Sequence, residues 1–200
     1  LERFELAQAI LDRAMQLEPE RAEIYFKYGA IRDQQENASG AIESYKEAIK
    51  LRKDYPEAHN NLGVLYHEAR DYQSAIDEFN AAIDWAPSFA EAYLNKGNAL
   101  KGRGDFKGAA GAFEQALDVD PGFADAYFNL GILYLDSDFD GMETIPELRK
   151  SVEYFEKYKS AKSGRFDDDD PIHKYLKEAN KAIEVEKQRQ EMMREQQQQP

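Results

Sequence analysis

The chain of 200 residues contains no cysteine. Without thiols it cannot form disulfides, thiolate nucleophiles, iron–sulfur clusters or cysteine-ligated zinc sites. Histidine is also scarce, and two of the three, His59 and His67, are offset by about 80° on one predicted helix, which is unsuited to a shared metal. The third is His173. Because no phosphate-binding loop, His-Glu-x-x-His sequence or nucleophile elbow is present, we predict a non-catalytic protein whose histidines lie at or near the surface.

Basic residues are the second deficit. Lysine and arginine number 26 against 39 aspartate and glutamate residues, which gives a formal net charge of −13. Nucleic-acid backbones and anionic membrane surfaces both attract basic patches, so neither is an expected partner. No apolar run approaches the roughly 18 residues of a membrane span, and we therefore expect no membrane insertion by this chain.

Small residues recur along the chain with one fixed spacing of 34 residues. Apolar residues recur at helical spacing within each unit, and turn-forming pairs such as Arg70-Asp71 separate two such segments. Each unit is therefore a helical hairpin with small residues where its helices cross. The expected fold is all-α, with one unpaired helix, four hairpins, a capping helix and no sheet. The repeating residues include Gly29, Gly63, Gly97 and Gly131, and Ala7, Ala41, Ala75 and Ala109.

With this pattern the chain resembles the tetratricopeptide repeat family. Three positions depart from the family pattern: His59 replaces an aromatic residue, Lys96 a leucine and Arg32 a tyrosine. The resemblance implies a right-handed solenoid of stacked hairpins whose first helices line a concave groove. The second repeat shows the pattern as His59, Leu62-Gly63, Tyr66, Ala75, Phe79, Ala82 and Pro87.

The repeat register also divides the chain. A capping helix is expected to start at Asp170-Pro171, because aspartate is a good N-cap and proline a good first helical residue. Beyond it, apolar residues almost vanish, so we expect a disordered tail. The predicted parts are a second helix of a truncated repeat (1–21), three repeats (22–55, 56–89 and 90–123), a fourth repeat (124–165) with an inserted acidic loop (136–147), the capping helix (170–186) and a polar, glutamine-rich tail (187–200).

The final third of the chain carries a second resemblance. Gly141-Met142-Glu143-Thr144, the segment 152–158 and the Lys/Glu/Gln-rich end are similar to repeat lipoproteins associated with bacterial gliding motility. This resemblance implies a bacterial periplasmic or envelope protein in a multiprotein assembly. The composition leaves the compartment open, and the cytoplasm remains an alternative.

The family resemblance implies an adaptor that binds an extended segment of a partner protein in the groove. Asn61, Asn95 and Asn129 occupy equivalent positions in three repeats, and a carboxamide suits a peptide main chain because it both donates and accepts. In peptide-binding members of the family such an asparagine ladder contacts the ligand main chain. The alternative is that these asparagines satisfy local backbone groups. The residues expected to flank the ladder are Asn60, Asn98, Phe26, Leu94 and Phe128.

The same positions indicate the charge of the partner. Family members that clamp a C-terminal carboxylate pair use lysine or arginine where this chain has Phe26, Asn60, Glu91 and Asp125. Acidic residues at 23, 57, 91 and 125 add negative charge to the same side. We therefore expect a neutral or basic partner rather than an acidic one.

The N-terminal end suggests a second function, self-assembly as a structural scaffold. The chain begins at Leu1 rather than methionine, and the first helix of its first repeat is absent, so we expect a piece of a longer protein. Without that covering helix, apolar side chains are left for upstream residues or a second copy to bury. The residues expected to mediate self-association are Phe4, Leu6, Ile10, Leu11 and Leu17.

The inserted loop fits the pattern D-x-D-x-D-G-x5-E of a calcium-binding EF-hand loop. Such a loop supplies six to eight oxygens to one calcium ion. Glu143 departs from the apolar residue expected at its position, and Pro146 stands where the exiting helix normally begins. The alternative is a solvated acidic insertion. The predicted ligands are Asp136, Asp138, Asp140, Met142, Thr144 and Glu147.

Overall fold

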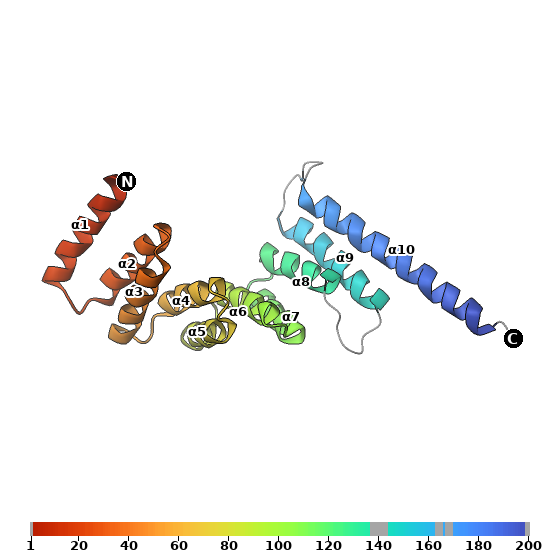
Figure 1. Cartoon of the computed structure of the whole chain (residues 1–200), viewed down its shortest axis with the longest axis horizontal. Coiled ribbons are helices and arrows are strands. Elements are labelled where there is room, and N and C mark those ends of the chain that lie inside the picture. The colour runs from red at the N-terminus through yellow and green to blue at the C-terminus, as the bar shows by residue number, and fades with distance from the viewer. Residues whose placement is uncertain (1, 137–143, 163–165, 167–169, 199–200) are drawn as a thin grey trace. The chain divides into compact units, whose positions relative to one another are not determined.

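A computed structural model describes residues 2–136, 144–162, 166 and 170–198, with the side chains of residues 2–5 and 198 left aside. Within these ranges the chain forms ten α-helices and no strand, as expected (Figure 1). None of these helices combines the length and apolar character that a membrane span needs. The chain divides into two compact units, Leu1–Arg103 and Gly104–Pro200.

The first unit contains α1 to α6. Its unpaired first helix packs on α2, where Leu11 joins Ile24 and Tyr28 in a small core. Two antiparallel hairpins follow, α2 with α3 and α4 with α5, and α6 packs on both helices of the second hairpin. The bounds are α1 Glu2–Leu17, α2 Ala22–Gln34, α3 Ala38–Leu51, α4 Pro56–Glu68, α5 Tyr72–Trp85 and α6 Ala90–Gly102.

One type of turn recurs at the start of α3, α5 and the helix α7 (Phe106–Val119) of the second unit. The side chains of Asn37, Asp71 and Asp105 each accept a hydrogen bond from the backbone N–H three residues on, at 3.1, 3.2 and 2.9 Å. Each is therefore a helix N-cap that satisfies a backbone donor without an intrahelical partner. The residue before each cap has a positive φ, which glycine adopts without strain and other residues do not. These residues are Glu36 (φ 59°), Arg70 (φ 61°) and Gly104 (φ 87°).

Each hairpin closes through a glycine on its first helix and an aromatic ring on its second. A methyl group at Gly29 would lie 2.6 Å from Tyr45, and one at Gly63 would lie 2.7 Å from Phe79. The two rings are about 1% exposed, so neither can move aside into solvent. Glycine is therefore required for the first and second helices to approach this closely. The repeat alanines Ala41 and Ala75 are fully buried beside the rings.

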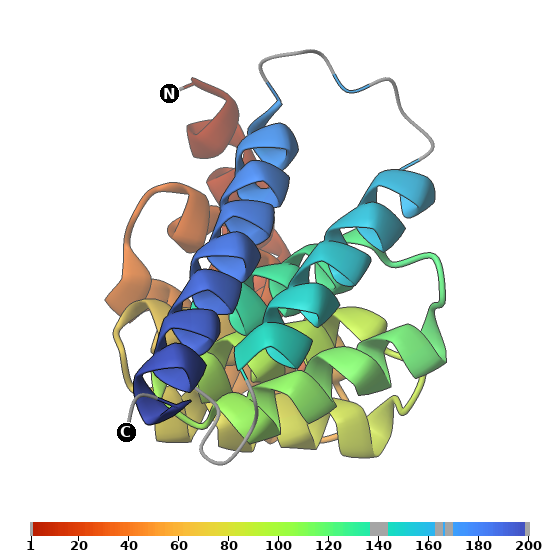
Figure 2. The same ribbon diagram turned by 90° about the vertical axis from the view of Figure 1, so that its right-hand side faces the viewer.

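The second unit contains α7 to α10. The α8–α9 hairpin repeats the same contact, because a methyl group at Gly131 would lie 2.5 Å from the buried ring of Phe155. Ser151 is fully buried and donates to the Gly131 carbonyl oxygen at 2.7 Å. The helix α10 lies antiparallel to α9, as Figure 2 shows. The bounds are α7 Phe106–Val119, α8 Ala124–Asp136, α9 Thr144–Ala161 and α10 Pro171–Gln198.

The capping helix starts where the sequence predicts and ends much later. The Asp170 carboxylate accepts a hydrogen bond from the backbone N–H of Ile172 at 3.0 Å, and the helix begins at Pro171. The expected end at 186 and the expected disordered tail are wrong, since α10 continues to Gln198. Good helix formers and local ion pairs sustain it, including Lys187 with Glu184 at 2.6 Å and Arg189 with Glu186 at 2.8 Å.

The glycine–ring contact predicts opposite effects for one substitution at two helical glycines. We expect Gly63→Ala to lower the free energy of unfolding by about 1–2 kcal/mol, because overpacking against Phe79 outweighs the gain in helix propensity. The matched control is Gly111→Ala, where no atom lies within 4 Å of the new methyl group. The control should gain about 0.5–1 kcal/mol. Urea unfolding measures both, and equal effects would show that the contact imposes no constraint.

Candidate functional site

The two ladder asparagines of the first unit lie on α4 and α6. Glu57 and Asn61 are four residues apart on α4, as are Glu91 and Asn95 on α6, so each pair shares one face of its helix. The two asparagines are half-buried and the two glutamates are exposed. We call these four residues the amide–acid face.

Both amides of this face are held in place by hydrogen bonds. The Asn61 side-chain amide donates to the Tyr45 hydroxyl at 3.3 Å, and the Asn95 amide donates to Asn60 Oδ1 at 3.0 Å. Burial raises the pKa of Tyr45, so its phenol is neutral and available as a partner at physiological pH. Each asparagine keeps a side-chain oxygen and a second N–H. One asparagine side chain can therefore satisfy a local hydrogen-bond partner and still offer an acceptor and a donor to a ligand main chain.

Several expected flanking residues are less accessible than predicted. Asn60 is 3% exposed and Leu94 is 8% exposed, so both belong to the packing between repeats and do not flank an open surface. Phe26 is half-buried against the rings of Tyr45 and Tyr55, with ring centroids 5.6 and 4.9 Å away. Asn98 is half-buried.

The corresponding residues of the second unit lie on α8. Asn129 is half-buried and Asp125 is exposed. Phe128 packs against Tyr158 and Tyr175, with ring centroids 5.3 and 5.6 Å apart. Its ring therefore contributes to the core between α8, α9 and α10 in this unit.

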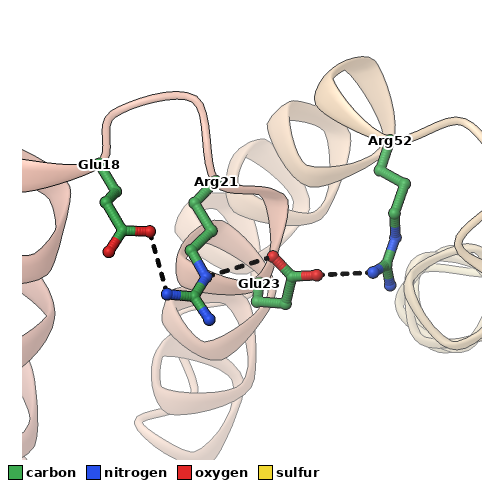
Figure 3. A network of polar contacts seen from close by, with 4 residues as sticks. All are labelled: Glu18, Arg21, Glu23 and Arg52. Atoms are coloured by element: carbon green, nitrogen blue, oxygen red, sulfur yellow. Dashed lines mark hydrogen bonds and ion pairs between the residues drawn. The ribbon is translucent and has the colours of Figure 1, made fainter.

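One of the expected acidic groups is neutralised within the first unit. The Glu23 carboxylate lies 2.6 Å from Arg52 and 3.7 Å from Arg21, and Arg21 also reaches Glu18 at 3.0 Å (Figure 3). The Arg52 guanidinium in turn lies over the Tyr55 ring, 3.4 Å from its centroid. By contrast, no described basic side chain forms an ion pair with Glu57 or Glu91. The uncompensated negative charge of this unit's first helices therefore lies on α4 and α6.

One histidine, His59, is buried, although the sequence predicts that all three histidines lie at or near the surface. His59 is 9% exposed, and its Nδ1 lies 2.6 Å from a Glu78 carboxylate oxygen while its Nε2 lies 3.2 Å from the Lys53 carbonyl oxygen. The contact with Glu78 joins α4 to α5 at the position where the repeat pattern has an aromatic residue. His67 is half-buried beside Tyr72 and His173 is exposed. Among the described residues, no three acidic or histidine side chains are placed to hold a metal ion.

The predicted self-association residues lie on α1 and divide into two groups. Leu6, Ile10 and Leu17 are 64%, 60% and 66% exposed, which makes them the three most exposed large apolar side chains among the described residues. Leu11 is only 8% exposed, and its assignment to an association surface is wrong because it packs on α2. The side chain of Phe4 lies outside the described residues.

Three predicted calcium ligands line one cleft of the second unit. Asp136 ends α8, Thr144 begins α9 and Glu147 lies in the first turn of α9 with 5% exposure. The cleft also contains Glu186, whose two carboxylate oxygens accept from Arg189 at 2.8 Å each. The remaining predicted ligands, Asp138, Asp140 and Met142, lie outside the described residues. Calcium binding therefore stays a prediction.

The helices just described define a helical-repeat protein built from antiparallel hairpins. Family models confirm the class: one described as a TPR repeat matches residues 29–69 and 97–138, and one described as a tetratricopeptide repeat matches residues 56–89. The chain belongs to the tetratricopeptide repeat family. No curated protein matches it significantly. Its resemblance to gliding-motility lipoproteins is not tested by these findings and stays a prediction.

Solved structures of other repeat proteins share the fold. MamA is 26% identical, covering 81% of this chain and 84% of its own, with a TM-score of 0.68. PilW, described as a widely conserved type IV pilus biogenesis factor, is 24% identical over 94% of this chain and 84% of its own, with a TM-score of 0.73. YrrB, described as a TPR protein with an unusual peptide-binding site, is 22% identical over 90% of this chain and 84% of its own, with a TM-score of 0.67.

The calcium prediction can be tested by melting. If the EF-hand pattern binds calcium, a hundredfold excess over the dissociation constant should stabilise the fold by about 2.7 kcal/mol and raise Tm relative to chelator. Glu147→Gln should remove most of that shift, because it takes away the carboxylate that closes the loop. An unchanged Tm in calcium and in chelator for the parent protein would show that the pattern is coincidental.

Proposed function

We propose that this protein is a non-catalytic adaptor that binds an extended segment of a partner protein in the groove formed by its first helices. The observation that carries the proposal is the pair of anchored carboxamides, Asn61 and Asn95. Their hydrogen bonds to Tyr45 and Asn60 fix the amides before a ligand arrives. A fixed group loses less side-chain freedom on binding than a mobile one, so preorganisation favours affinity.

The charge of the partner follows from the same face. Glu57 and Glu91 flank the two amides, and the whole chain carries a net charge of −13. An acidic segment would be repelled here, whereas a neutral or basic one would not. Protein interaction is the general role of this fold family, and YrrB is described as having a peptide-binding site. Both points support a binding role without identifying the partner.

The most buried histidine, His59, is not placed to act as a general base. A general base needs a free lone pair within reach of a substrate. His59 has both ring nitrogens engaged, by Glu78 and by the Lys53 carbonyl, and it is buried. Its place is therefore structural, joining the helices of one hairpin.

A second candidate function is self-assembly through α1. Leu6, Ile10 and Leu17 fall within about 40° of one another around the helix axis, at spacings of four and seven residues. They form an exposed apolar stripe that is distinct from the face buried on α2. Burying each leucine-sized side chain against a second copy would contribute about 1–2 kcal/mol.

The binding proposal predicts that each ladder asparagine contributes separately to peptide affinity. Peptides selected by phage display on the intact protein provide the probe. Replacing Asn61 or Asn95 by alanine should each weaken their binding by about 1 kcal/mol, the net worth of a hydrogen bond. Asn180→Ala, on the exposed side of α10, is the matched control and should leave affinity unchanged. The two asparagines have no ligand role if the double alanine variant stays folded and binds as the parent does.

The assembly proposal predicts concentration-dependent association. Light scattering after size-exclusion chromatography should show dimers or larger species of the parent chain at high micromolar concentration. Replacing Leu6, Ile10 and Leu17 together by serine should return the protein to a monomer. Val185→Ser removes an apolar side chain of similar exposure, 56%, from α10 and should not change the mass. A parent protein that is monomeric at every concentration contradicts this function.

A further inference from the structure

The amide–acid face, whose role as a peptide site rests on the proposed function, forms two parallel rows across α4 and α6. Along each helix the carboxylate precedes the carboxamide by four residues, a rise of about 6 Å. One row therefore holds Glu57 and Glu91, and the other holds Asn61 and Asn95.

The spacing between the helices sets the repeat of both rows. The Asn95–Asn60 hydrogen bond of 3.0 Å joins α6 directly to α4. Helices in direct side-chain contact have axes about 8–10 Å apart. Equivalent residues on the two helices are therefore separated by a similar distance.

This repeat discriminates between conformations of a bound segment. In a polyproline II helix every third residue faces the same side after about 9 Å, and the backbone N–H groups have no internal partner. In a β-strand, side chains return to one side after two residues, or about 7 Å. An α-helix uses its own N–H groups internally. Only the polyproline II helix supplies both free backbone N–H donors and equivalent side chains at the spacing of α4 and α6.

We propose that the amide–acid face binds a segment in polyproline II conformation with a lysine or arginine at two positions three residues apart. The two basic side chains pair with Glu57 and Glu91. Two backbone N–H groups of the segment donate to the side-chain oxygens of Asn61 and Asn95, so the residues that supply them are not proline. The basic side chains span the rise of about 6 Å between the amide row and the acid row.

The pattern ends at α2, which limits the segment to two basic residues on this unit. The carboxylate equivalent to Glu57 is Glu23, which already pairs with Arg52 and Arg21 (Figure 3). The residue equivalent to Asn61 is Lys27, which is exposed and repels a basic side chain. The structure thus provides two anchored amides in register with two carboxylates that form no ion pair with a described residue, and no third such pair on α2.

Synthetic peptides test the spacing directly. The probes are fluorescently labelled ten-residue alanine–proline peptides with two arginines separated by two, three or four positions, and a neutral peptide with glutamine in place of arginine. Fluorescence anisotropy should give the three-residue spacing about fivefold tighter binding than the other two spacings, as expected for the loss of one exposed ion pair worth about 1 kcal/mol when the spacing is wrong. Raising the salt concentration should reduce this preference.

Variants separate this inference from the proposed function. The double variant Glu57→Gln/Glu91→Gln should abolish the spacing preference, whereas the charge-matched Glu43→Gln/Asp84→Asn, on second helices, should retain it. Equal affinity for all three spacings, or a preference that survives the first variant, overturns the inference. In either of those cases, the proposed peptide-binding function still holds if the neutral peptide binds and the double variant Asn61→Ala/Asn95→Ala lowers its affinity. If no peptide binds at millimolar concentration, both proposals fail.

Discussion

The contact of a glycine with an aromatic ring holds each hairpin together, and the positions of the surface residues depend on it. Because Gly29 and Gly63 have no side chain, the rings of Tyr45 and Phe79 lie directly on the backbone of the preceding helix. This close approach fixes both the distance and the rotation of the first helix. The rotation determines which residues remain outside, and on α4 these include Glu57 and Asn61. Tyr45 shows the coupling most directly, because its ring packs on Gly29 while its hydroxyl accepts from Asn61.

The repeat and its helices could be predicted from the sequence because a fixed period of small residues reports backbone contacts directly. The contacts of residues that depart from the period could not be predicted from the sequence. Arg32 replaces an aromatic residue, and its guanidinium donates to the Gly40 carbonyl at 3.0 Å and to Ser44 at 2.8 Å. The length of α10 was missed because loss of apolar residues signals lost packing, whereas a run of Glu, Lys, Gln and Arg keeps its helical propensity and its local ion pairs.

The candidate site was predicted only in outline. Register alone placed Asn61 and Asn95 on equivalent helices, but their hydrogen-bond partners come from other helices and carry no sequence signal. The neutralisation of Glu23 depends on Arg52, which lies 29 residues away along the chain. His59 and Glu78, 19 residues apart, pair for the same reason: the hairpin brings their helices together. Tertiary contacts of this kind decide which repeated acidic residues remain available to a ligand.

The α8–α9 hairpin shows that the length of the connection between two helices is independent of the contact between them. Gly29 and Tyr45, like Gly63 and Phe79, are 16 residues apart, whereas Gly131 and Phe155 are 24 residues apart and make the same contact. Lengthening a connection costs little, since each doubling of a flexible loop adds only about 0.6 kcal/mol of closure entropy. The length of the connection between two helices can therefore change while the glycine–ring contact that joins them is kept, as the α8–α9 hairpin shows.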